Sequence, residues 1–168
     1  MTADEIIFYL RELNDELAAL DVKGEICIYG GAAMCLVFKA RPSTKDVSAI
    51  FEPVKYMRGA TAKIAEKHNL PIDWLNFGVK MFVVQHDKKI FYDLPNLKVY
   101  VPTSDYLLAM KVLAARADTF DLDDTIMLIK ELDLRNVADV LEISKSYYPG
   151  KEIKAETTFQ LEELFENI

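Results

Sequence analysis

The order of hydrophobic periodicities along the chain constrains its fold more than any other feature. Strand-like apolar runs occur only between residues 25 and 101, where they alternate with segments of helical spacing. After Pro102 every apolar segment has helical spacing. This order predicts an α/β fold of the α+β kind, with a small mixed β-sheet flanked by helices and a helical C-terminal portion, and it disfavours a repeated βαβ barrel.

The individual elements follow from apolar spacing and from the breaks between segments. We expect helices at residues 3–20, 32–38, 54–68, 103–116, 121–132, 136–147 and 155–166. We expect strands at residues 25–29, 46–51, 89–92 and 97–101, while the stretch 70–84 fits no single pattern. Residues 1–102 then form an α/β core and residues 103–168 a helical portion packed on it, which together make a single compact unit.

Composition limits the classes of function. The 168 residues are 51% hydrophobic and 28% charged, which excludes a disordered or low-complexity chain. The net charge of −7 repels nucleic acid, so a nucleic-acid contact needs a local patch. No apolar run approaches the roughly 20 residues of a membrane span, so we expect no membrane partner. Two cysteines within apolar runs indicate free thiols in a reducing cytoplasm.

Charge is unevenly distributed along the chain. Residues 39–67 hold seven basic and three acidic side chains, whereas residues 116–168 hold six basic and thirteen acidic ones. Two solvated faces of opposite sign explain this distribution. A basic rim suited to phosphates, and an acidic tail that meets a basic partner, explain it as well.

The segment from the first strand to the second carries the clearest chemical pattern. Gly30 and Gly31 follow an apolar strand and precede a helix, an arrangement that lets a backbone approach a phosphate closely. Tight packing of the strand on the helix would also explain the glycines. Asp46 opens the next predicted strand, and position 48 shares its face because side chains alternate along a strand. Two acids there would converge on one Mg²⁺, but position 48 holds Ser48.

A second pattern lies in the helix predicted at residues 103–116. From residue 106 to residue 115, Lys111 is the only residue that is neither apolar nor aromatic. Its ammonium group therefore needs a carboxylate or an anion-binding cleft. Arg116, Asp121 and Asp124 follow. Asp121 either caps the next helix or belongs to an anion site, and Asp124 either joins that site or is solvated.

Together these motifs resemble the minimal nucleotidyltransferases, in particular the branch of AbiEii/MenT-like toxins and related bacterial proteins. The resemblance covers roughly residues 5–132. It rests on Gly30-Gly31, on Arg41-x-Ser43-x-x-Asp46-Val47, and on Lys111 with Arg116, Asp121 and Asp124. It implies a nucleotidyltransferase-like fold and the Mg²⁺-dependent transfer of a nucleotide from an NTP to a hydroxyl group, which in the toxins is the 3′ end of a tRNA.

The resemblance also implies a role for each matching residue. Asp46, Lys111 and Asp121 would be catalytic, with Asp46 also binding the metal. The residues that would bind the nucleotide are Gly30, Gly31, Arg41, Ser43, Ser48 and Arg116. Ser48 stands where the family has a second acid, so two hypotheses remain besides the active enzyme. One is a catalytically degenerate protein that binds a nucleotide or a partner protein without turnover, and the other is an antitoxin-like interaction protein.

Overall fold

The computed structural model describes residues 1–114 and 122–168, and these residues form two compact units. The first unit comprises Met1–Val83 and Lys88–Pro102, and it contains the whole β-sheet. The second unit comprises Val84–Asp87 and Thr103–Ile168, and its described elements are helices. The chain therefore has the predicted α+β architecture, with a mixed sheet flanked by helices and a helical C-terminal portion.

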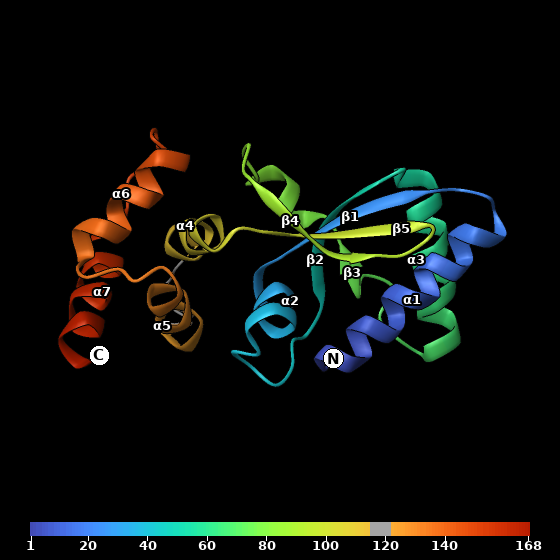
Figure 1. Ribbon diagram of the computed structural model, residues 1–168, viewed down its shortest axis with the longest axis horizontal. Helices are drawn as coiled ribbons and strands as arrows, with labels where there is room; N and C mark the ends of the chain where they lie inside the picture. Colours follow the sequence, from blue (N-terminus) through green and yellow to red (C-terminus); the bar gives the residue numbers. More distant parts are fainter. Residues whose placement is uncertain (115–121) are drawn as a thin grey trace. The chain divides into compact units, whose positions relative to one another are not determined.

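The sheet has five strands in the order β3-β2-β1-β5-β4. Its strands are β1 (Gly24–Tyr29), β2 (Val47–Glu52), β3 (Leu75–Asn76), β4 (Lys88–Asp93) and β5 (Leu97–Pro102). β1 is antiparallel to β2 and parallel to β5, β2 is parallel to β3, and β4 is antiparallel to β5. The sheet is thus mixed, as Figure 1 shows.

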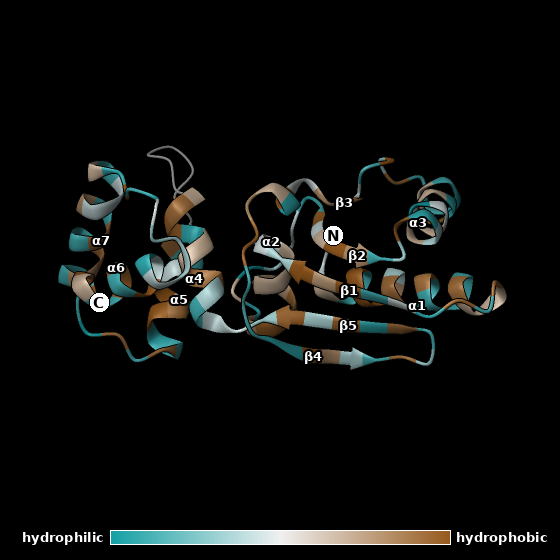
Figure 2. Ribbon diagram, turned by 90° about the horizontal axis from the view of Figure 1, so that it is seen from above, coloured by the Kyte–Doolittle hydropathy of each residue, from teal (hydrophilic) through white to brown (hydrophobic). Residues whose placement is uncertain are grey.

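Two long helices pack on this sheet. They are α1 (Ala3–Ala19), which contacts β5, and α3 (Val54–His68), which contacts β2, and the two helices also contact each other. The start of α1 is a capping box formed by Thr2 and Glu5. Alternate strand residues supply the core of the first unit, and Figure 2 shows hydrophobic residues along β1 and β5. Among the buried residues are Ile26, Ile28, Ala49, Phe51 and Val99.

A short helical segment follows β1 directly. It begins as α2 (Gly30–Ala33) and continues as a π-helical turn, η1 (Met34–Phe38), which ends at Lys39 in a left-handed conformation. A 3₁₀ turn, η2 (Gly78–Met81), follows β3 and contacts β2. The sequence predicts a helix over residues 32–38, but the helical segment begins two residues earlier, and only its first four residues are α-helical.

The second unit contains α4 (Ser104–Ala114), α5 (Leu122–Glu131), α6 (Val137–Tyr147) and α7 (Ala155–Asn167). α4 packs against α5 and α6, and α6 packs against α7. The predicted residues Arg116 and Asp121 lie outside the residues that the structure describes. Within the described parts of the chain, none of the helices combines the length and the apolar character that crossing a bilayer requires.

Candidate functional site

Gly30 and Gly31, where β1 passes into α2, form what we call the glycine turn. Each of the two glycines is required for a different reason. Gly30 has a φ of 61°, a left-handed conformation that favours glycine. A Cβ atom on Gly31 would lie 2.9 Å from the Thr44 hydroxyl oxygen and 3.0 Å from a guanidinium nitrogen of Arg41. The loop between η1 and β2, which contains Arg41 and Thr44, therefore packs directly on the glycine turn. This close approach explains why position 31 is a glycine.

The loop itself is held at the start of α1. The Thr44 N–H donates to the Met1 carbonyl oxygen at 2.8 Å, and the Met1 amino group donates to the Thr44 carbonyl oxygen at 2.6 Å. Thr2 and Ser43 form an isolated antiparallel β-bridge beside these bonds. The Thr44 hydroxyl donates to the Asp46 carbonyl oxygen at 3.3 Å. Because these contacts extend the loop through Asp46, β2 begins at Val47, one residue later than the sequence predicts.

Asp46 and Ser48 lie at the same end of the sheet as the glycine turn. Ser48 is half-buried and pairs with Tyr29, the residue before Gly30, and with Asn76 on β3. The Asp46 carboxylate is exposed and accepts a hydrogen bond from the Asn76 amide at 3.4 Å. The structure therefore brings together Gly30, Gly31, Arg41, Ser43, Asp46 and Ser48.

Two residues that the sequence analysis missed belong to this end of the sheet. Thr44 contacts the glycine turn, and Asn76 contacts Asp46. Thr44 lies between Ser43 and Asp46 in the motif that carries the resemblance, so it could have been predicted from its position in the sequence. Asn76 could not have been predicted, because its two-residue strand pairs with β2 across a long stretch of chain.

The residues at this end fit one Mg²⁺ ion that arrives with a polyphosphate. Mg²⁺ is bound in such sites through one or two carboxylates together with phosphate oxygens and water. Asp46 supplies one exposed carboxylate, and this carboxylate lies on the Ser48 side of β2, because Asn76 pairs with Ser48 in the sheet and its amide donates to Asp46. The described residues include no group of three or more His, Cys, Asp or Glu side chains that could hold a metal ion. A metal held by the protein alone does not fit.

Lys111 forms a buried ion pair in the second unit. Its ammonium nitrogen lies 2.5 Å from a carboxylate oxygen of Asp124, and the two side chains are only 15% and 2% exposed. The sequence correctly indicates that the lysine needs an anionic partner. The alternative interpretation, that Asp124 is solvated, is wrong, because its carboxylate is buried against Lys111 between α4 and α5. Since Lys111 and Asp46 belong to different units, their convergence stays a prediction.

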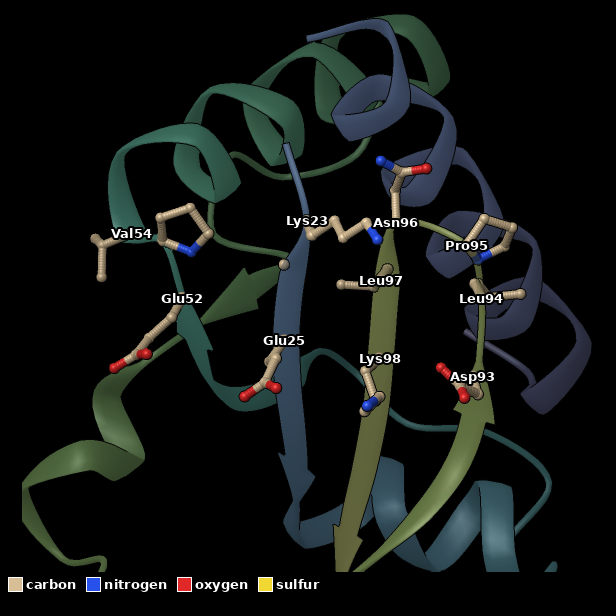
Figure 3. A pocket seen from close by; sticks show the side chains of 12 residues that line it. Lys23, Glu25, Glu52, Val54, Asp93, Leu94, Pro95, Asn96, Leu97 and Lys98 are labelled. Carbon is tan, nitrogen blue, oxygen red and sulfur yellow. The ribbon is translucent and has the colours of Figure 1, made fainter. Parts of the chain in front are cut away.

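A pocket of about 790 Å³ lies at the opposite end of the sheet (Figure 3). It opens where β1 begins and β2 ends, and none of the predicted site residues lines it. Four charged residues from neighbouring strands form a row across the sheet beside it, in the order Glu52, Glu25, Lys98 and Asp93. The row holds three carboxylates and one ammonium group, with Glu52 and Glu25 adjacent, and the pocket lies at the end of the sheet away from the glycine turn.

Comparisons of the chain with protein-family models, with curated proteins and with solved structures found no match. The resemblance to the nucleotidyltransferases therefore rests on the sequence motifs alone.

Proposed function

We propose that this chain is a nucleotidyltransferase-like protein that binds an NTP at the glycine turn and transfers a nucleotide to a hydroxyl group of RNA or protein. The observation that carries the proposal is the packing of the Arg41–Asp46 loop on Gly31. This packing sets the Arg41 guanidinium and the Thr44 hydroxyl against the glycine turn, and the Asp46 carboxylate follows in the same loop. Such a set of groups suits a triphosphate and its metal ion.

Each residue has a distinct part in the proposed binding. The backbone at Gly30, where a Cβ atom would meet nothing within 4 Å, permits close approach of the phosphates, and Gly31 lets the loop that carries Arg41 pack beside them. Arg41 and Ser43 contribute hydrogen bonds to phosphate oxygens, and an arginine provides a planar pair of donors for this purpose. Ser48 contributes a hydroxyl on the face that Asp46 shares.

Mg²⁺, when bound, would neutralise charge on the phosphates, and Asp46 is the residue that would hold it. Lys111 would contribute positive charge to the same phosphates if the two units bring it there. Its pairing with Asp124 would then orient the ammonium group. Arg116 and Asp121 are assigned to the site by resemblance alone.

In this proposal the protein acts in the cytoplasm, as the toxin of a toxin–antitoxin pair. The acceptor class would be tRNA, and the protein partner would be a cognate antitoxin. The basic stretch at residues 39–67 supplies the local positive charge that an overall acidic protein needs for an RNA contact.

The second candidate is a degenerate member of the same class that binds a nucleotide without turnover. Ser48 favours it, because a neutral hydroxyl cannot replace the charge of a second metal-binding carboxylate. The ion pair between Lys111 and Asp124 favours it as well, since a lysine neutralised in a buried pair has less charge to offer a phosphate.

One experiment separates these candidates. The full chain is incubated with total RNA and each α-labelled NTP in turn, with and without Mg²⁺, and transfer of label is measured alongside nucleotide binding. An active enzyme transfers label only with Mg²⁺, and the Asp46→Asn variant transfers none. Binding without transfer identifies the degenerate form. If no NTP binds, the proposal is wrong.

A further inference from the structure

Thr44 makes contacts in three directions within the loop beside the glycine turn. Its backbone exchanges two hydrogen bonds with Met1, at 2.6 and 2.8 Å. Its hydroxyl donates to the Asp46 carbonyl oxygen at 3.3 Å. The same hydroxyl oxygen occupies the space beside Gly31 that a Cβ atom would need. Thr44 therefore contacts the start of α1, the glycine turn and Asp46.

We infer that Thr44 is a positioning residue of the proposed triphosphate site, through which the start of α1 fixes the loop over Gly31 and sets the position of Asp46. The inference rests on the proposed function and adds to it a residue outside the assigned set. Thr44 does not have to touch the nucleotide. It acts through Gly31 and Asp46.

The start of α1 is a firm anchor for this purpose. Thr2 and Glu5 exchange the two hydrogen bonds of a capping box, at 3.2 and 3.3 Å. One turn further on, Ile6 and Leu10 are buried in the core of the first unit. The loop that contains Thr44 is hydrogen-bonded to the start of α1 and is therefore fixed to the core. Apart from the bridge to Thr2, this loop has no regular secondary structure.

The hydroxyl and the backbone of Thr44 have separable effects. Valine has nearly the shape of threonine, so Thr44→Val keeps the backbone pairing with Met1 and removes the donor to Asp46. The Asp46 carbonyl then lacks this partner, and an apolar methyl group replaces the hydroxyl beside Gly31. Serine retains the hydroxyl, so Thr44→Ser should restore the contact. Neither change alters a side chain that the proposal assigns to phosphate or metal.

Thr61 provides a matched control within the same unit. Its hydroxyl also donates to a backbone carbonyl, that of Arg58, at 2.9 Å, but on α3. Thr61→Val therefore removes the same kind of hydrogen bond away from the loop. Any effect that both valine variants share is a general effect of the substitution.

The test titrates the full chain and its three variants with ATP, GTP, CTP and UTP, each with MgCl₂, and records urea melts in parallel. We expect Thr44→Val to lower the affinity for the bound NTP by about tenfold, the equivalent of one hydrogen bond. Thr44→Ser should bind within about twofold of the parent, since its hydroxyl is kept. Thr61→Val should leave the affinity unchanged. Trypsin should also cleave Thr44→Val faster after Lys45 than it cleaves the parent.

Other results overturn the inference. If the parent binds an NTP and Thr44→Val binds it equally well, Thr44 has no positioning role, while the proposed function stands. Equal losses in Thr44→Val and Thr61→Val, or a loss that Thr44→Ser does not restore, also exclude that role. If the parent binds none of the four nucleotides, the proposed function fails and this inference fails with it.

Discussion

Lys111 and Asp124 show how a single pair of residues bears on both stability and function. Burial of a lone ammonium or carboxylate costs several kcal/mol, and this pair offsets that cost through a short contact. A structural role therefore suffices to explain the lysine, and a phosphate-binding role has to be measured separately.

Lys111→Met should lower the free energy of unfolding by on the order of 3–5 kcal/mol, because it leaves the Asp124 carboxylate buried without this partner. Urea melts measure the change. The double variant Lys111→Met/Asp124→Leu should regain most of the loss, since neither charge remains.

Arg135 serves as the control for Lys111, because it pairs with Asp133 at 3.2 Å on the surface, where both side chains are at least 77% exposed. Arg135→Met should change stability by less than about 1 kcal/mol. A neutral or stabilising Lys111→Met would contradict the structural pair and would favour an anion-binding lysine.

Ser48→Asp should strengthen Mg²⁺ binding by about tenfold, because Asn76 pairs with Ser48 and contacts the Asp46 carboxylate, so a second carboxylate at position 48 would join the first. Titration of Mg²⁺ in the presence of NTP measures the change. Ser48→Asn is the matched control, since it adds the same bulk without charge. If the rest of the site is competent, transfer of label should rise in Ser48→Asp alone. Unchanged Mg²⁺ affinity would mean that position 48 does not face the metal.

At the scale of elements, α4 and α6 are joined by a network of tyrosines and one acid. The Tyr147 hydroxyl donates to the Asp105 carboxylate at 2.6 Å, and the Thr103 hydroxyl donates to the same carboxylate at 2.6 Å. Burial alone would raise the pKa of Asp105, but these hydrogen bonds, with another from the Tyr106 N–H, lower it below its ordinary value. Burial and the neighbouring Asp105 raise the pKa of Tyr147 to about 12.

Tyr147→Phe should therefore destabilise the protein in a pH-dependent way. A carboxyl group with a lowered pKa in the folded state adds stability above its unfolded pKa of about 3.9, and this stability is lost as the pH falls through the folded pKa. We expect a loss of about 1.5–3 kcal/mol at pH 7, typical of a hydrogen bond to a charged group. In acid, as the pH falls through the lowered pKa of folded Asp105, the difference from the parent should narrow, because Asp105 becomes protonated in both proteins.

Tyr148→Phe is the control for this pH dependence. The Tyr148 hydroxyl lies 2.7 Å from the buried hydroxyl of Tyr106, and both groups stay neutral in acid. In urea melts, Tyr148→Phe should lower the free energy of unfolding by the same amount at pH 7 and in acid. A Tyr147→Phe loss that does not change with pH would show that Asp105 is not the partner that matters.

The long elements were predictable from sequence because their apolar periodicity is strong. The predicted helices at 3–20 and 54–68 correspond to α1 and α3, and the predicted strands at 25–29 and 97–101 correspond to β1 and β5 within one residue. The periodicity reflects the spacing of apolar residues on one buried face of each element. This spacing is local, so it can be read directly from the sequence.

The short elements beside the site were not predictable. β3 has only two residues, and its pairing with β2 depends on a contact between distant parts of the chain. The same limit applies to the site residues. Strand alternation predicts a shared face for Asp46 and Ser48, but Asp46 precedes β2, and its place beside Ser48 depends on the contact with Asn76 across that distant pairing. Asp124 could not be distinguished from its neighbouring acids as the partner of Lys111 without the packing of α4 on α5.

At the scale of the whole molecule, the proposed catalytic set is divided between two compact units. The glycine turn, the loop and Asp46 belong to the first unit, and Lys111 belongs to the second. Nucleotide binding by the first-unit residues is therefore the central claim, and transfer additionally requires the second unit to contribute. Binding can be tested apart from the acceptor.

The most direct test is an equilibrium titration of the full chain with ATP, GTP, CTP and UTP, each with and without MgCl₂, for the parent, Gly31→Ala and Asp46→Asn. We expect at least one nucleotide to bind the parent at one site. Gly31→Ala should weaken that binding by at least about tenfold, because its Cβ would displace Thr44 and Arg41 from the turn. Asp46→Asn should remove the dependence on Mg²⁺. Failure of all four nucleotides to bind the parent, or equal binding by all three proteins, would contradict a nucleotide site at this end of the sheet.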